Sequence, residues 1–105
     1  MEQVDLWIDD VREMPDGYNV HAKNSAEGLV IVEKAVAGSL LLRSVSFDHD
    51  LGGTDDAYIV ACRIEQEAYA GRLPQLTWNI HSMNSVGCRR IRAAMESAEK
   101  AWTNQ

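Results

Sequence analysis

The sequence predicts a small α/β domain in which a mostly parallel, four-stranded sheet is covered by helices on both faces. Short β-rich runs alternate along the chain with segments whose apolar residues recur at helical spacing, and this alternation is typical of parallel strands joined by helices. Polar residues follow directly after three of the β-rich runs, as expected where buried strands deliver side chains to one edge of a sheet. The 105 residues are enough for one core, so residues 1–105 are expected to form a single domain.

The first two β-rich runs are separated by a short loop. Residues 4–10 read V-D-L-W-I-D-D, an apolar run that ends in paired aspartates. Residues 18–23 alternate weakly between apolar and polar, which predicts an edge strand with His21 on the surface. The loop between these runs contains about eight residues, fewer than a parallel crossover usually needs. Either an irregular loop therefore makes the crossing, or the second strand is antiparallel.

The first helix is predicted from the sequence Asn-Ser-Ala-Glu at residues 24–27. This is the spacing of a capping box, in which Asn24 caps the helix and Glu27 reaches back towards it. Gly38 stands where a left-handed residue commonly ends a helix. The β-rich run at residues 40–47 follows and leads directly into the sequence Asp-His-Asp.

Two further helices and one strand complete the predicted order. Thr54 is expected to cap the second helix, which ends near Gly71. Residues 76–80 form the last strand, and Asn84 opens the last helix. Apolar residues at helical spacing define the expected buried faces, which are Ala57, Val60, Ala61, Ile64 and Ala68 in the second helix and Ile91, Ala94, Met95, Ala98 and Trp102 in the last.

The composition argues against several classes of function. The chain is 46% hydrophobic and 25% charged, and no apolar run approaches the roughly 20 residues that a membrane span requires. The first residues do not resemble a signal peptide, so we expect a cytoplasmic protein without a membrane partner. The net charge of −6 argues against binding duplex DNA, which relies on lysine and arginine. Cys62 and Cys88 lack the spacing of metal ligands and are expected to be reduced thiols.

Side chains suited to phosphate-ester chemistry follow three of the predicted strands. Attack on phosphorus needs a base for water, an acid for the leaving oxygen and donors for the other phosphate oxygens. Histidine suits both proton transfers, because its pKa lies near neutrality. The residues expected at this edge of the sheet are Arg12 after the first strand, Asp48, His49 and Asp50 after the third, and His81, Ser82 and Asn84 after the fourth.

The acidic residues of this group have two interpretations. The pair Asp9 and Asp10 after a buried strand, with Asp48 at the next strand end, is typical of a site for a hard cation. Alternatively, Asp10, Asp48 and Asp50 orient the histidines. A single histidine at a strand end is often only a satisfied polar residue, whereas two at neighbouring strand ends indicate a site.

The order of these residues resembles that of response-regulator receiver domains. The resemblance implies that Asp9 and Asp10 form the acidic pair that holds magnesium, that Asp48 stands at the position of the phosphoryl acceptor, and that Ser82 contacts the phosphate. The chain departs from that family because it lacks the first helix and the fifth strand with its lysine. It also has histidines where receiver domains need none. These departures argue against ordinary phosphorelay signalling.

A closer resemblance is to cyclic-phosphate processing receiver domains, whose motifs look like D-D-x-R, H-D-L-G and H-S-x-N. The same motifs stand in the same order at residues 9–12, 49–52 and 81–84, and Gly87 follows as in that family. The resemblance implies a receiver-like, flavodoxin-like three-layer sandwich with strand order 2-1-3-4. It also implies activity on cyclic phosphates in RNA processing or repair, in a family that is frequent in phages.

The predicted function is that of a phosphoesterase acting on the cyclic phosphate of a nucleotide or of an RNA end. One of His49 and His81 would activate water while the other protonates the leaving ribose oxygen. Arg12, Ser82 and Asn84 would bind the phosphate oxygens. A divalent cation such as Mg²⁺ would be held by Asp9, Asp10 and Asp48.

Two other classes of function are compatible with the same residues. One is a non-catalytic receiver-like module that binds a cyclic nucleotide or a protein partner. The other is a phosphoacceptor domain that is modified at Asp48, which ranks last because the lysine of receiver domains is missing.

Overall fold

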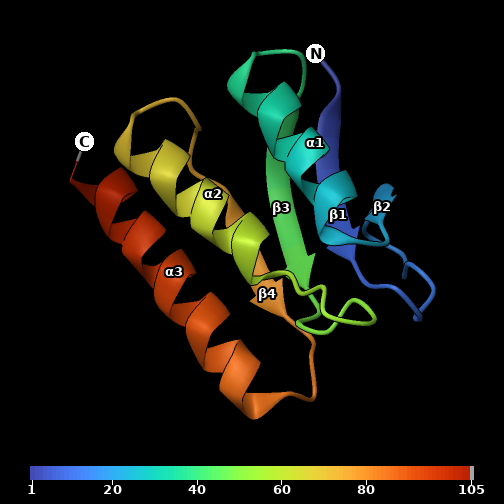
Figure 1. Ribbon diagram of the computed structural model, residues 1–105. Helices are drawn as coiled ribbons and strands as arrows, with labels where there is room; N and C mark the ends of the chain where they lie inside the picture. Colours follow the sequence, from blue (N-terminus) through green and yellow to red (C-terminus); the bar gives the residue numbers. More distant parts are fainter. Residues whose placement is uncertain (105) are drawn as a thin grey trace.

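The structure, a computed structural model, describes residues 1–104. This part of the chain contains four strands and three helices. The sheet order is 2-1-3-4, and every pairing is parallel (Figure 1). The predicted receiver-like α/β fold and its strand order are therefore confirmed. In chain order the elements are Gln3–Ile8 (β1), Val20–Ala22 (β2), Ser25–Val36 (α1), Leu41–Phe47 (β3), Tyr58–Tyr69 (α2), Thr77–Ile80 (β4) and Ser85–Thr103 (α3).

The strand β2 runs parallel to β1, so the antiparallel alternative is wrong. An irregular loop, residues 9–19, makes the crossing. Asn19 at its end starts the pairing, because its side-chain oxygen accepts a hydrogen bond from the backbone N–H of Asp5 at 2.8 Å and its amide donates to the carbonyl of Gln3 at 2.8 Å. The side chain of Asn19 thus makes hydrogen bonds to the β1 backbone of the kind that a neighbouring strand would make. The loop therefore leads into β2 without a helix.

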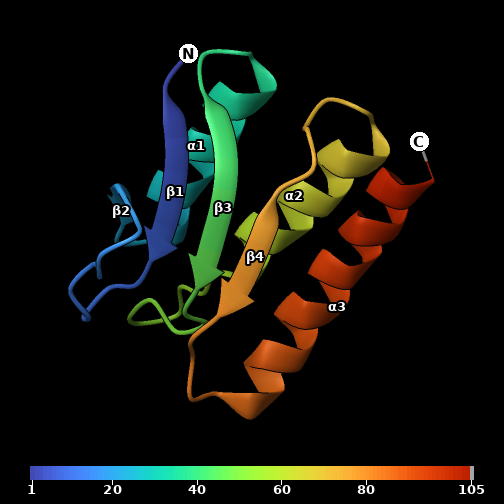
Figure 2. The same cartoon turned by 180° about the vertical axis from the view of Figure 1, so that it is seen from behind.

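The helices cover only one face of the sheet. In Figure 1 α1 and α2 lie in front of the strands, in Figure 2 they lie behind them, and α3 packs beside α2 and along β4. The apolar strand residues on that side, such as Leu6, Val45 and Phe47, share one core with the helices. The prediction of helices on both faces is therefore wrong for residues 1–104, which form two layers instead of three.

The open face of the sheet is polar, which is why no helix is needed to cover it. Polar residues alternate with apolar ones from Ser44 to the end of β3 and through β4, so that Ser44 lies beside Thr77 and Ser46 beside Asn79. On β1 the same face carries Asp5, whose carboxylate accepts a hydrogen bond from Oγ of Ser44 at 2.6 Å. A sheet with one apolar and one hydrogen-bonded polar face is stable with helices on the apolar side alone.

The predicted cap of α1 and the predicted start of α3 at Asn84 are confirmed. The side chain of Asn24 accepts from the backbone N–H of Glu27 at 2.8 Å, and that of Asn84 accepts from the backbone N–H of Gly87 at 2.9 Å. The predicted inner faces of α2 and α3 are also confirmed, since all ten of their apolar residues are buried. Among residues 1–104, no helix combines the length and the apolar composition that crossing a membrane requires.

The helix α2 begins at Tyr58, so the prediction that Thr54 caps it is wrong. The two acids after Thr54 are engaged in tertiary contacts instead of the first turn. The carboxylate of Asp55 accepts from the backbone N–H and the hydroxyl of Ser25, at 2.8 and 2.5 Å. Asp56 forms an isolated bridge with Asp50, and its side chain accepts from the N–H of Tyr58. These contacts hold the loop after β3 in an irregular form.

Candidate functional site

The carboxyl ends of β1, β3 and β4 open into a cleft of about 480 Å³. The two predicted histidines contact residues that line this cleft and do not line it themselves. A second hollow, of about 510 Å³, lies beside Trp78 and the C-terminal half of α3 and contains none of the predicted site residues. Seven of the nine predicted residues line the cleft at the strand ends, together with Val11, Gly52 and Met83: Asp9, Asp10, Arg12, Asp48, Asp50, Ser82 and Asn84.

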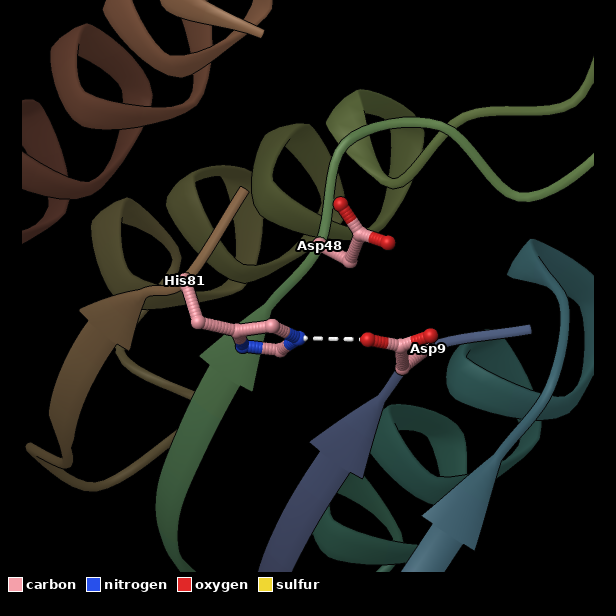
Figure 3. Close-up of side chains that lie close together, drawn as sticks. All are labelled: Asp9, Asp48 and His81. Carbon is pink, nitrogen blue, oxygen red and sulfur yellow. Dashed lines mark hydrogen bonds and ion pairs between the residues drawn. The ribbon is translucent and has the colours of Figure 1, made fainter. Parts of the chain in front are cut away.

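Asp9 is fully buried after β1, and both of its carboxylate oxygens are occupied. Its Oδ1 accepts hydrogen bonds from the backbone N–H groups of Val11 and Arg12, both at 2.8 Å. Its Oδ2 lies 3.0 Å from Nε2 of His81, whose ring reaches from the end of β4 across the end of β3 (Figure 3). Asp48 follows β3 between them, and one atom of each of the three side chains lies within 4.8 Å of the others. The edge of the sheet thus brings two carboxylates and one imidazole together.

Burial and hydrogen bonding set the charges of the pair formed by Asp9 and His81. Burial by itself raises the pKa of Asp9, but the N–H groups of Arg12 and Val11 and the His81 ring outweigh it and hold that pKa below its ordinary value of 3.8. Burial lowers the pKa of His81 below its ordinary value of 6.5, against the opposing effects of Asp9 and Asp48. At neutral pH the pair is therefore a carboxylate and a neutral imidazole, with the ring proton on Nε2 because a carboxylate only accepts.

Two residues that sequence reasoning missed hold the His81 ring. The indole of Trp7 stacks on it, with ring centroids 3.8 Å apart and planes at 6°. The hydroxyl of Ser46 lies 2.8 Å from Nδ1. Trp7 and Ser46 are register partners on β1 and β3, so both stand on the open face beneath the ring. Because a hydroxyl can donate or accept, Ser46 is compatible with either tautomer of His81.

Arg12 and His21 hold backbone groups of the site. Nη1 of Arg12 donates to the carbonyl oxygen of His81 at 2.7 Å, which ties the loop after β1 to the end of β4. His21 is half-buried on β2, and its Nε2 donates to the carbonyl oxygen of Asp9 at 2.7 Å. His21 is partly exposed on the edge strand, but its hydrogen bond to the site was not predicted. Only the pairing of β2 with β1, in which His21 lies beside Trp7, could have shown this contact.

His49 lies on the helix side of the sheet, beneath the first turn of α3. Gly87 leaves room for its ring, since a Cβ at that position would lie 2.3 Å from two ring carbons. Its Nδ1 lies 3.0 Å from Oδ1 of Asp50. Its Nε2 is buried without a hydrogen-bond partner among the described residues and is 4.0 Å from the carboxylate of Asp56. Nδ2 of Asn84 also lies 3.3 Å from Nδ1, so the ring of His49 reaches the cleft through Asp50 and Asn84.

The wall of the cleft formed by Asp50, Ser82 and Asn84 is a hydrogen-bonded unit. The amide of Asn84 donates to both carboxylate oxygens of Asp50, at 3.3 and 3.4 Å, while its own oxygen caps α3. The hydrogen bond from His49, followed by that from Asn84, lowers the pKa of Asp50. The hydroxyl oxygen of Ser82 accepts from the N–H of Asn84 at 3.1 Å, which leaves the hydroxyl proton available to a ligand.

Asp10 and Asp48 differ from the other acids of the cleft. Among residues 1–104, neither side chain makes a hydrogen bond or an ion pair, although both line the cleft. Unpaired carboxylate oxygens that face water are the ligands that Mg²⁺ prefers, because this ion binds through one or two carboxylates and keeps several waters. Of these two, Asp48 belongs with Asp9 and His81 to the group whose ligand atoms lie within 4.8 Å of one another and fits such a cation. Among residues 1–104 Asp10 does not belong to that group, so the predicted set of Asp9, Asp10 and Asp48 is not brought together.

The comparison with protein families agrees with the motifs and with the cleft. The family model of the cyclic-phosphate processing receiver domain matches residues 4–97. The chain belongs to this family. The match includes the ends of β1, β3 and β4 and therefore all the residues that line the cleft, so this receiver domain is associated with cyclic-phosphate processing. No curated protein and no solved structure matches the chain.

Proposed function

We propose that this receiver domain is a phosphoesterase that opens the cyclic phosphate of a nucleotide or of an RNA end. The proposal is based on one observation: the His81–Asp9 pair and side chains that can donate hydrogen bonds to a phosphate lie at the same edge of the sheet. His81 supplies a ring that is neutral at pH 7, because burial lowers its pKa, and that can accept a proton. Arg12 and Ser82 line the cleft and keep donors for a phosphate. Arg12 uses only part of its N–H groups within the protein, and the hydroxyl of Ser82 accepts a hydrogen bond without donating one.

The charge of the cleft favours a cyclic diester over a phosphate monoester. Four carboxylates line it, those of Asp9, Asp10, Asp48 and Asp50, against the single guanidinium of Arg12. A cyclic diester carries one negative charge, whereas a monoester carries about −1.5 to −2 at pH 7. Repulsion by the carboxylates is therefore weaker for the substrate than for the product, which favours release after the ring opens.

The guanidinium of Arg12, the hydroxyl of Ser82 and the amide of Asn84 bind the phosphate oxygens. Arg12 keeps N–H groups free beyond the one that it donates to the His81 carbonyl. Its attachment to that carbonyl fixes the guanidinium between the loops after β1 and β4. A donor that is already held in place needs little reorganisation as charge develops on phosphorus.

In this proposal His81 takes a proton from the attacking water. With its proton moved to Nδ1, where Oγ of Ser46 can accept it, Nε2 gives up its hydrogen bond to Oδ2 of Asp9 and receives the proton of water as oxygen bonds to phosphorus. The bond from phosphorus to one ribose oxygen breaks, and that oxygen takes a proton from the water of the open cleft. Asp9 stabilises the imidazolium that results, and the ring then returns its extra proton to solvent.

A divalent cation held at Asp48, beside Asp9, would neutralise carboxylates of the cleft and polarise the phosphate oxygens. The predicted two-histidine scheme is the second candidate mechanism. It is supported by the contact between Nδ1 of His49 and Asp50, which lines the cleft, because His49 can supply a proton to the leaving oxygen along this path. In that scheme, activity survives EDTA and is lost in both His49→Ala and His81→Ala.

Phosphorus NMR of the protein with adenosine 2′,3′-cyclic phosphate and with RNA ending in a cyclic phosphate tests the proposal. The expected result is replacement of the cyclic-phosphate signal by that of a monoester. An unchanged signal, together with binding of the intact nucleotide by calorimetry, would show a non-catalytic binding module instead. Addition of EDTA and then of Mg²⁺ to the same samples measures the requirement for a cation.

A further inference from the structure

Two exposed apolar side chains stand in the acidic cleft, and the proposed chemistry uses neither of them. Val11 is 82% exposed and Met83 is 89% exposed, and both line the cleft. Single exposed apolar residues are common on protein surfaces and need no explanation. These two differ because they line the same cleft and because each is next in the chain to a residue proposed to donate a hydrogen bond to the phosphate. Val11 precedes Arg12, and Met83 follows Ser82.

The backbone on both sides of the hollow is held by hydrogen bonds. The N–H of Val11 donates to Oδ1 of Asp9 at 2.8 Å. Met83 lies between Ser82 and Asn84, which are joined by the 3.1 Å bond from the Asn84 N–H to the Ser82 hydroxyl. Ordered backbone presents these two side chains to solvent, so little conformational entropy of the backbone is lost when a ligand covers them.

The size and the charge of the cleft restrict what these side chains contact. A volume of about 480 Å³ lies within the range of small-molecule sites, about 300–1,000 Å³, so a ligand larger than a phosphate group fits. The surrounding carboxylates disfavour a second anionic group on that ligand. A flat, uncharged, largely apolar group attached to the phosphate satisfies both conditions, and a nucleobase is such a group.

We propose that Val11 and Met83 form an apolar clamp for the base of a nucleoside cyclic phosphate whose phosphate is held by Arg12, Ser82 and Asn84. This inference rests on the proposed function, because it assumes that the phosphate lies at those donors. The clamp makes Val11 and Met83 specificity-determining residues. They distinguish a nucleoside cyclic phosphate from a cyclic phosphate that lacks a base and leave the chemistry at phosphorus unchanged.

The test compares kcat/KM for adenosine 2′,3′-cyclic phosphate and for glycerol 1,2-cyclic phosphate in the wild type and in the double variant Val11→Thr/Met83→Gln. Both substitutions nearly keep the size of the side chain and make it polar. We expect the wild type to prefer the adenosine compound and the double variant to lose about tenfold or more of kcat/KM for it. The value for the glycerol compound is expected to stay the same.

The matched control is the double variant Val86→Thr/Met14→Gln, which makes the same two changes outside the cleft. Val86 is 66% exposed and Met14 is 36% exposed, and neither lines the hollow. Wild-type preference in this control is expected. An equal loss with both substrates, the same loss in the control variant, or no loss in the cleft variant would overturn the clamp.

Calorimetry separates failure of the clamp from failure of the proposed function. If the wild type opens neither compound, the phosphoesterase proposal fails, and the clamp is judged by binding of the adenosine compound alone. About tenfold weaker binding in Val11→Thr/Met83→Gln than in the wild type and in the control supports it. Equal binding in all three proteins, or no binding by the wild type, contradicts it.

Discussion

The two histidines that follow β3 and β4 stand on opposite sides of the sheet, in environments that differ in almost every respect. His81 lies on the open polar face, stacked on Trp7 and joined to Asp9 and Ser46. His49 lies on the helix side beneath Gly87, with one ring nitrogen on Asp50 and the other without a hydrogen-bond partner among the described residues. The sequence presents them as an equivalent pair, and the fold separates them.

This difference indicates different roles. The ring of His81 lies beside the carboxylates of Asp9 and Asp48 and has a hydroxyl partner that allows either tautomer, so it is suited to proton transfer. The ring of His49 is enclosed by α3 and reaches the cleft through Asp50, so it is suited to positioning that wall. We therefore propose that His81 transfers protons and that His49 positions this wall of the cleft.

The largest expected effect comes from removing the ring on the open face. In His81→Asn, kcat/KM for a nucleoside cyclic phosphate is expected to fall by about 10²- to 10⁴-fold, the usual contribution of a general acid or base. His21→Asn is the matched control, because His21 also contacts Asp9, but through the backbone carbonyl and away from the cleft. Steady-state kinetics of both variants, with circular dichroism to verify folding, makes the comparison. Comparable losses in the two variants would contradict the role of His81.

The next effect tests the enclosure of His49. Gly87→Ala places a Cβ 2.3 Å from the ring, and we expect it to lower the free energy of unfolding by about 1–3 kcal/mol. In a His49→Ala background the clash is absent, and the same change is expected to stabilise the protein, by up to about 1 kcal/mol, because alanine favours a helix over glycine. Urea denaturation of the four proteins measures both values. A destabilisation of the same size in both backgrounds would show that the ring does not pack against Gly87.

The parts of the site that could be predicted from the sequence are those specified by neighbouring residues. Asn24 was recognised as a cap and Asn84 as a helix start because the start of a helix has a local pattern, and both side chains accept a backbone N–H of the first turn. Seven of the nine residues predicted for the site line the cleft, because parallel strands deliver the residues after their carboxyl ends to one edge. Their roles stay predictions.

The parts that could not be predicted depend on register and on tertiary contacts. The stack of His81 on Trp7 and its bond to Ser46 follow from the pairing of β1 with β3, which one sequence does not specify. Thr54 resembled a helix cap, but the acids after it bind elsewhere, one of them to Ser25. The open face did have a signal that was not used, since the polar residues Ser44 and Ser46 alternate with apolar ones in the second half of β3.

A smaller effect is expected in the dependence of kcat/KM on pH, which tests His81 on the open face of the sheet. Asp9 raises the pKa of His81 through its hydrogen bond and its charge, while burial holds that pKa below 6.5. Asp9→Asn removes the charge but keeps an acceptor for the N–H groups of Val11 and Arg12, so the pKa of His81 is expected to fall further. Because the neutral ring is the base, the acid limb of the profile of kcat/KM against pH moves to lower pH. A shift to higher pH, or an unshifted limb, would show that this limb does not report His81.

Chemical rescue by imidazole tests most directly whether His81 transfers protons and His49 positions the wall. Small-molecule imidazole is titrated into His81→Gly and into His49→Gly during turnover of adenosine 2′,3′-cyclic phosphate. We predict that imidazole restores activity to His81→Gly, in proportion to its unprotonated form, because it can replace a missing base. No such recovery is predicted in His49→Gly, where the lost ring held Asp50 in place. Recovery in His49→Gly without recovery in His81→Gly would contradict the assignment of the two histidines.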